Sequence, residues 1–108
     1  MPDRFDPEQP AVARKLALIP ELEKVAADAG MPLTHLAIGF TLAHPAISSA
    51  IIGPRTMEQL QDALAGADLR LDEAALDAID EVVPPGTLVD ENDRGISPWW
   101  LEASARRR

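Results

Sequence analysis

One short segment, residues 46–52, limits what this chain can fold into. It carries the β-branched residues Ile47 and Ile51 and ends at Gly53-Pro54. A short apolar run closed by turn residues is typical of a buried strand, most often in a parallel sheet. One strand cannot satisfy its own backbone N–H and C=O groups, so it needs neighbouring strands that the rest of the sequence does not supply. The sequence therefore predicts part of a helix-strand-helix layer rather than a closed helical bundle.

Helical periodicity precedes this strand. Asp6, Pro7 and Gln9 form the pattern of a helix start, with a cap, a first-turn proline and a capping-box partner. Pro20 lies inside the helical pattern, so we expect it to kink or split the helix. Gly30 is expected to end it. The apolar face of this helix is predicted to consist of Leu18, Leu22, Val25, Ala26 and Ala29.

The next helix is predicted over Leu33–Ala43, which is apolar nearly all round. Such a helix belongs between layers rather than on a surface. After the strand, Thr56 and Gln59 match the T-x-x-Q capping box, so a helix is expected to start at Thr56 and end at Gly66.

A last helix is expected to begin at Asp72 and to end before Pro84-Pro85-Gly86. Its buried face is predicted to consist of Leu76, Ile79, Val82 and Val83. The fold class is thus mostly α with one or two short strands. Residues 1–86 form the folded part, and residues 87–108 are expected to be a tail or loop.

Composition excludes several classes of function. The chain has 108 residues, 46% of them hydrophobic, which allows one domain at most. Eighteen acidic and ten basic residues give a formal charge of −8, which argues against a nucleic-acid or anionic-membrane binder. There is no cysteine, which excludes disulfides and thiolate chemistry and fits a reducing cytoplasm. The run Leu36–Ile52 is too short and too interrupted to span a bilayer.

The tail carries two features. Three arginines, Arg106 to Arg108, are expected to be a solvated end. Trp99 and Trp100 are expected to pack back on the body of the protein, because large aromatic side chains bury well. The alternative is that they line the mouth of a substrate pocket.

Chemistry is predicted where the strand passes into the helix that starts at Thr56. The amino end of a helix suits an anion, because its free N–H groups and its dipole point there. Gly53 allows close backbone approach, and the planar guanidinium of Arg55 matches a phosphate. Gln59 and Asp62 lie further along this helix and are candidates for polar contacts to a nucleotide. Each residue also has a structural explanation: a turn for Gly53, solvation for Arg55, a cap for Gln59 and an ordinary helix surface for Asp62.

Five segments carry a resemblance to a known family: 36–45, 49–56, 58–60, 22–26 and 71–86. Together they resemble the carboxyl-terminal region of the aldo-keto reductases, nearest to the bacterial and potassium-channel-β-like branch. The order of helix, apolar run, I-I-G-x-R-T and E-Q-L is specific. The resemblance covers most of this chain but only the last part of a family member.

The resemblance implies a fragment of a (β/α)8 TIM barrel in which residues 46–52 form the last strand. A nicotinamide cofactor would lie at the carboxyl face of that barrel, near the last strands. Gly53, Arg55 and Gln59 would then clamp the adenosine 2′-phosphate and its ribose, and Asp62 would face the adenine. An arginine at position 55, where several members carry serine, would favour NADP over NAD. Ala63 stands where many members carry asparagine.

The catalytic group of that family is an Asp, a Tyr, a Lys and a His on earlier strands. This chain has no tyrosine, and nothing assigns its own lysines or histidines, Lys15, Lys24, His35 and His44, to those roles. His44 is expected to be structural. We therefore assign no catalytic residue and no metal ligand.

Three interpretations of the whole chain stay open at this point. The first is the carboxyl-terminal piece of a cytoplasmic NADP-dependent carbonyl reductase, whose partner is the missing amino-terminal barrel segment. The second is a non-catalytic binding or assembly module that forms a homo-oligomer to cover its apolar faces. The third is a small helical protein without redox function. The carbonyl substrate cannot be read from any of these residues.

Overall fold

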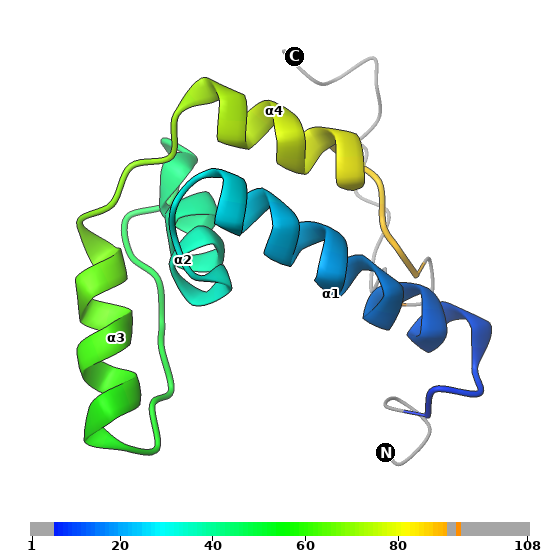
Figure 1. Ribbon diagram of the computed structural model, residues 1–108, viewed down its shortest axis with the longest axis horizontal. Coiled ribbons are helices and arrows are strands. Elements are labelled where there is room, and N and C mark those ends of the chain that lie inside the picture. The colour runs from blue at the N-terminus through cyan, green and yellow to red at the C-terminus, as the bar shows by residue number, and fades with distance from the viewer. Residues whose placement is uncertain (1–5, 91–92, 94–108) are drawn as a thin grey trace.

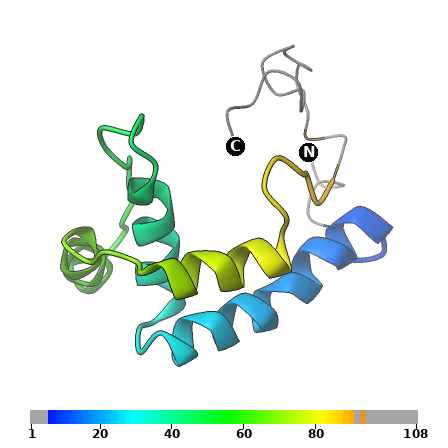
Figure 2. The same cartoon turned by 90° about the horizontal axis from the view of Figure 1, so that it is seen from above.

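A computed structural model describes residues 6–90 and 93, and they contain four helices and no strand. The helices are α1 (Pro10–Asp28), α2 (Leu33–Ala43), α3 (Met57–Ala67) and α4 (Glu73–Val82). Helices α1 and α4 lie side by side and run in opposite directions (Figures 1 and 2). Helix α2 packs across the end of α1, and α3 packs on α2 at the edge of the molecule (Figure 1). The prediction of a mostly α chain is confirmed.

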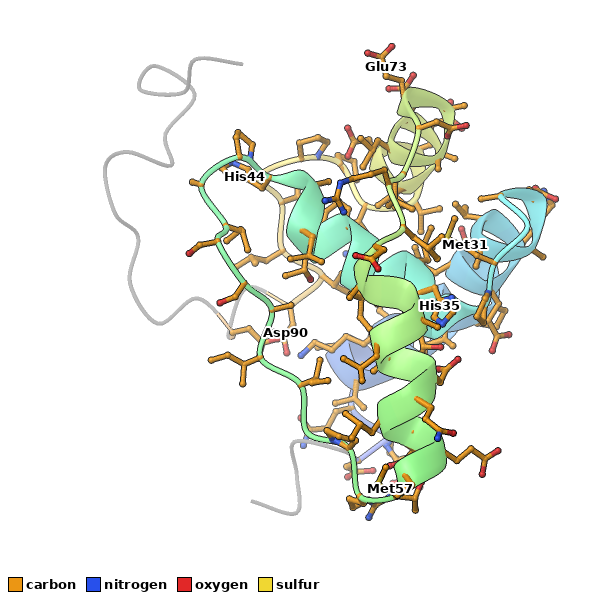
Figure 3. All side chains as sticks on the ribbon, turned by 90° about the vertical axis from the view of Figure 1, so that its left-hand side faces the viewer. Met31, His35, His44, Met57, Glu73 and Asp90 are labelled. Carbon is orange, nitrogen blue, oxygen red and sulfur yellow. The ribbon has the colours of Figure 1, made fainter. Side chains whose placement is uncertain are left out.

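The predicted strand is wrong for the chain as it stands. Residues 46–52 follow an extended course alongside α3, without forming a strand (Figures 1 and 3). The side chain of Ile51 is 100% exposed, and Ile47 and Ile52 are 43% and 40% exposed. The physical reason is that a single strand needs a neighbouring strand to pair with. No other described segment offers a paired edge, so the backbone groups of 48–52 have no partner in the described chain.

The first helix begins later than predicted. Asp6 forms a turn instead of a helix cap, because its carbonyl accepts from the amide of Gln9 at 3.1 Å and its Oδ1 accepts from the amide of Glu8 at 3.0 Å. The helix then starts at Pro10, which fills the first position in place of Pro7.

Pro20 does not split α1, which continues to Asp28. Buried residues lie on both sides of the proline, at Val12 and Ala26. Packing therefore holds both halves against a cost of about 3 kcal/mol for an interior proline. Gly30 ends the helix as predicted, with φ of +72°. The amide of Gly30 bonds to Ala27 and that of Met31 to Ala26, the pair of bonds of a Schellman motif.

The core is small and lies where α1, α2 and α4 meet. Its centre consists of Ala26, Leu36 and Ile79. Around it pack the partly buried residues Leu22, Val25, Met31, Leu33 and Leu71. Leu36 is 2% exposed, whereas Phe40 on the same helix is 48% exposed. Helix α2 thus packs against both α1 and α3, in line with the predicted position between layers, but its Phe40 face is left half-exposed.

Candidate functional site

The turn that enters α3 is built around Thr56. Its backbone is extended, with φ of −130° and ψ of 158°, and its hydroxyl accepts a hydrogen bond from the amide of Gln59 at 3.2 Å. This is the predicted amino-terminal cap, and it fixes α3 to begin at Met57. The amides of Met57 and Glu58 have no acceptor among the described residues. The amino end of α3 therefore keeps two free donors.

Gln59 closes the cap from the other side. Its Oε1 accepts from the backbone amide of Arg55 at 2.8 Å, one residue before the position a capping box uses. Gln59 thus helps to close the amino end of α3, although with a different bond from that of the predicted capping box. Because the bond uses only the oxygen, the Gln59 amide nitrogen still has donors for another group.

Arg55 presents an uncommitted cation at the same place. Its guanidinium makes no hydrogen bond or ion pair within the described residues, and residue 55 is exposed. Glu58, in the first turn of α3, is the acidic side chain next to it in sequence. A planar guanidinium beside free helix amides suits a phosphate, since both supply N–H groups to its oxygens.

Gly53 has no structural reason to be glycine in the described chain. A Cβ atom at this position would meet nothing within 4 Å, and its φ is not positive. Neither packing nor backbone conformation therefore requires the missing side chain. The open space leaves the backbone of Gly53 free to approach another molecule closely.

Asp62 has a different environment from the other three candidates. Its Oδ2 accepts from the hydroxyl of Thr34 at 3.0 Å, and its Oδ1 lies 3.0 Å from Nε2 of His35. Both partners belong to α2. The structure thus brings Gly53, Arg55 and Gln59 together in one turn, while Asp62 bonds to the neighbouring helix.

Three further residues take part in this contact between α2 and α3, and no role in a site was predicted for them. They are Thr34, His35 and Gly66, and a Cβ atom at Gly66 would lie 2.9 Å from Cδ2 of His35. Gly66 was predicted only as a helix end, but it lies inside α3, which ends at Ala67. The signal available in the sequence was the spacing, because Asp62 and Gly66 are four residues apart and share one helix face.

The two lysines of the chain lie away from this turn. The pKa of Lys15 is raised by its hydrogen bond to Asp93; desolvation opposes this rise, and Asp90 adds to it. The pKa of Lys24 is raised by Asp28, four residues along α1 at 2.7 Å. Both lysines are therefore ion-paired at sites away from the turn.

His44 forms the end of α2. Its Nδ1 accepts from the amide of Ala46 at 3.1 Å, and it lies apart from His35 (Figure 3). That bond supports the structural role expected for His44. Among the described residues no group of three or more His, Asp or Glu side chains is arranged to hold a metal ion.

Two other predictions can be placed against the structure. No helix in residues 6–90 is both long enough and apolar enough to cross a membrane. Trp99, Trp100 and Arg106 to Arg108 lie outside the described residues, so the predictions made for them stay predictions.

The chain was compared with known proteins and with known protein families. An oxidoreductase of Bacillus subtilis (strain 168) that carries the name uncharacterized oxidoreductase YrpG is 38% identical over 53 residues. That stretch is 48% of this chain and 16% of the relative, so the chain matches a small part of the relative's length. No solved structure matches. The sequence pattern of the aldo/keto reductase family matches residues 1–84. The chain therefore belongs to the aldo/keto reductase family of oxidoreductases.

Proposed function

We propose that this chain is the carboxyl-terminal part of an NADP-dependent carbonyl reductase and supplies the clamp for the adenosine 2′-phosphate. The observation that carries the proposal is that Arg55, whose guanidinium has no partner among the described residues, directly precedes the cap of α3, where the amides of Met57 and Glu58 are free. A dianionic phosphate would supply acceptors for both groups, because its oxygens can accept from the guanidinium and from the helix amides at once.

The other members of the turn suit a nucleotide as well. The open space at Gly53 lets the backbone approach the ligand, and Gln59 retains its amide nitrogen as a donor. Asp62 is not part of the proposed clamp. Both of its carboxylate oxygens are engaged by Thr34 and His35, so an adenine contact would compete with these bonds.

The chain supplies binding and not the reaction. A reductase of this family moves a hydride from the nicotinamide to a carbonyl and needs an acid to protonate the product oxygen. The chain contains no tyrosine, and its two lysines are ion-paired away from the turn. The catalytic residues would therefore come from preceding βα units of a (β/α)8 barrel.

The exposed segment 46–52 fits this proposal. The backbone groups of residues 48–52 have no partner in the described chain, and Ile51 is fully exposed. Pairing with neighbouring strands would turn it into the last strand of the barrel and bury Ile47, Ile51 and Ile52. The DNA upstream of the coding sequence is then expected to encode an Asp, a Tyr, a Lys and a His on βα units. An upstream sequence without them would refute the fragment.

A direct test of the clamp uses two matched nucleotides. The full 108-residue chain is titrated calorimetrically with adenosine 2′,5′-bisphosphate and with adenosine 5′-monophosphate. The two differ by the 2′-phosphate, so the proposal expects the bisphosphate to bind at least about tenfold more tightly. Equal affinities would refute a 2′-phosphate site.

The second candidate, an assembly module, is favoured by a specific feature. A cavity of about 620 Å³ opens between α2, α4 and residues 84–87, and its lining is mainly apolar. Leu33, Phe40 and Val83 contribute to it. Self-association would cover this surface. Light scattering at high concentration separates the two candidates, because a stable oligomer without affinity for adenosine 2′,5′-bisphosphate would favour the module.

A further inference from the structure

Helix α3, which carries the proposed clamp, is held mainly by α2. Its extensive packing is with that helix, whereas α1 and α4 pack on one another (Figures 1 and 2). The two connections that flank α3, residues 44–56 and 68–72, contain no helix or strand. The position of the phosphate-binding turn therefore depends on how α3 is fixed to α2.

The polar part of that contact converges on Asp62. Nε2 of His35 lies 2.9 Å from the backbone oxygen of Asp62 and 3.0 Å from its Oδ1. Both atoms are acceptors, so this ring nitrogen carries a proton and donates. Thr34 donates to the other carboxylate oxygen at 3.0 Å. Two consecutive residues of α2 thus hold one residue of α3.

The imidazole of His35 is largely enclosed between α2 and α3. The side chain of His35 is 13% exposed and lies between α2 and α3 (Figure 3). A Cβ atom at Gly66, one helical turn after Asp62, would lie 2.9 Å from Cδ2 of the ring and 3.2 Å from Cγ. Glycine is unfavourable inside a helix, and here its missing side chain makes room for the ring.

We infer that Thr34 and His35 are positioning residues for the phosphate-binding turn, acting through Asp62. This inference rests on the proposed function of the turn. Asp62 is one helical turn beyond Gln59, which bonds to the amide of Arg55. Fixing Asp62 therefore fixes the amino end of α3 and the direction in which its free amides and Arg55 face a ligand.

The absence of cysteine allows a clean measurement of this position. Spin labels are placed at Gln61→Cys on α3 and Glu21→Cys on α1, both exposed positions, and the distance between them is measured by pulsed electron resonance. His35→Ala is expected to broaden the distance distribution. His35→Gln is expected to restore it, because the glutamine amide supplies a donor where Nε2 stood. The matched control is Thr41→Val, since the Thr41 hydroxyl bonds only to Ala37 within α2.

The same variants are titrated with adenosine 2′,5′-bisphosphate, without labels. His35→Ala is expected to bind about fivefold more weakly, as the loss of one hydrogen bond implies, and His35→Gln to bind like the parent. Thr34→Val is the milder variant to use if His35→Ala does not fold, because it leaves the imidazole beside Gly66 in place.

The outcomes separate the inference from the function on which it rests. An unchanged distance distribution in both His35→Ala and Thr34→Val would overturn the inference, and so would weaker binding without any broadening. If the parent chain binds both nucleotides equally, the clamp itself is refuted. The distance measurement then still decides whether Asp62 fixes α3, because it needs no ligand.

Discussion

Gly66 and His35 face one another across the contact between α3 and α2, so closely that a Cβ atom on residue 66 would lie 2.9 Å from the imidazole ring. Glycine inside a helix costs about 1 kcal/mol relative to alanine. The close approach that it permits lets His35 reach Asp62. The lower helix propensity at Gly66 thus accompanies the contact that fixes α3 on α2.

The first prediction follows from this contact. Gly66→Ala should lower the free energy of unfolding by about 1 kcal/mol, because overpacking against the ring costs about 1–3 kcal/mol and outweighs the gain in helix propensity. For a domain of this size that is a fall in Tm of about 5 °C, measurable by circular dichroism. A rise in Tm would show that the ring moves aside at little cost.

Gly53→Ala is the contrasting substitution. Nothing lies within 4 Å of a Cβ atom at position 53 and its φ is not positive, so stability should stay the same or rise by about 0.4–1 kcal/mol. Affinity for adenosine 2′,5′-bisphosphate should nevertheless fall, because the added methyl group occupies the side from which the ligand approaches. Unaltered affinity would remove Gly53 from the clamp. Circular dichroism and calorimetry on one sample measure both effects.

The ion pair between Lys15 and the acidic residues near position 90 should stabilise the chain in a pH-dependent way. Asp93 first, and then Asp90, hold the pKa of Lys15 above its ordinary value of 10.5. A raised lysine pKa contributes stability that is fully present below the unfolded value and is lost as pH rises through the folded value.

Lys15→Met should therefore lower the Tm at pH 7, and the difference from the parent chain should disappear at a pH above the folded value. Thermal melts at neutral pH and at a pH above the raised folded pKa of Lys15 measure the difference. Lys24→Met is the matched control, because within the described residues Lys24 pairs with Asp28 alone, on an exposed surface where such a pair contributes little. A Lys15 effect that persists at high pH would point to lost packing instead.

Substitution of Ile51 and of Leu36 should change the free energy of unfolding by very different amounts. Ile51→Ser should change the free energy of unfolding by less than about 0.5 kcal/mol, because the side chain is fully exposed. Leu36→Ala should cost about 2–5 kcal/mol, since Leu36 is 2% exposed at the centre of the core. Urea unfolding measures both. A large loss from Ile51→Ser, with a shift to smaller species in light scattering, would favour the assembly module.

The sequence predicted local structure well where the signal was local. The caps at Thr56 and Asp72 accept the bonds that their spacing implied, from Gln59 at 3.2 Å and from Ala75 at 2.8 Å. Gly30 also ends α1 as predicted, because only glycine takes a positive φ without strain.

Predictions that depended on partners elsewhere were less successful. Apolar periodicity at 46–52 indicated a strand, but a strand exists only when a second edge pairs with it. Pro20 was expected to kink or split α1, and burial of Val12 and Ala26 on either side holds the helix together. The bonds from Thr34 and His35 to Asp62 join residues more than 25 positions apart, so no local pattern marks them. Of the candidate site, Gly53, Arg55 and Gln59 meet in one turn, and Asp62 does not join them.

The most direct test of the account compares NADPH and NADH on the Arg55→Ala variant of the full chain. These two cofactors differ only by the 2′-phosphate. A charge-assisted bond contributes about 1.5–3 kcal/mol, so NADPH affinity should fall at least about tenfold while NADH affinity changes little. Arg70→Ala is the matched control, because the one bond of that guanidinium in the described part of the chain goes to the neighbouring Leu69 carbonyl. Equal losses for both cofactors, or an equal effect of Arg70→Ala, would contradict the assignment of Arg55 to the 2′-phosphate.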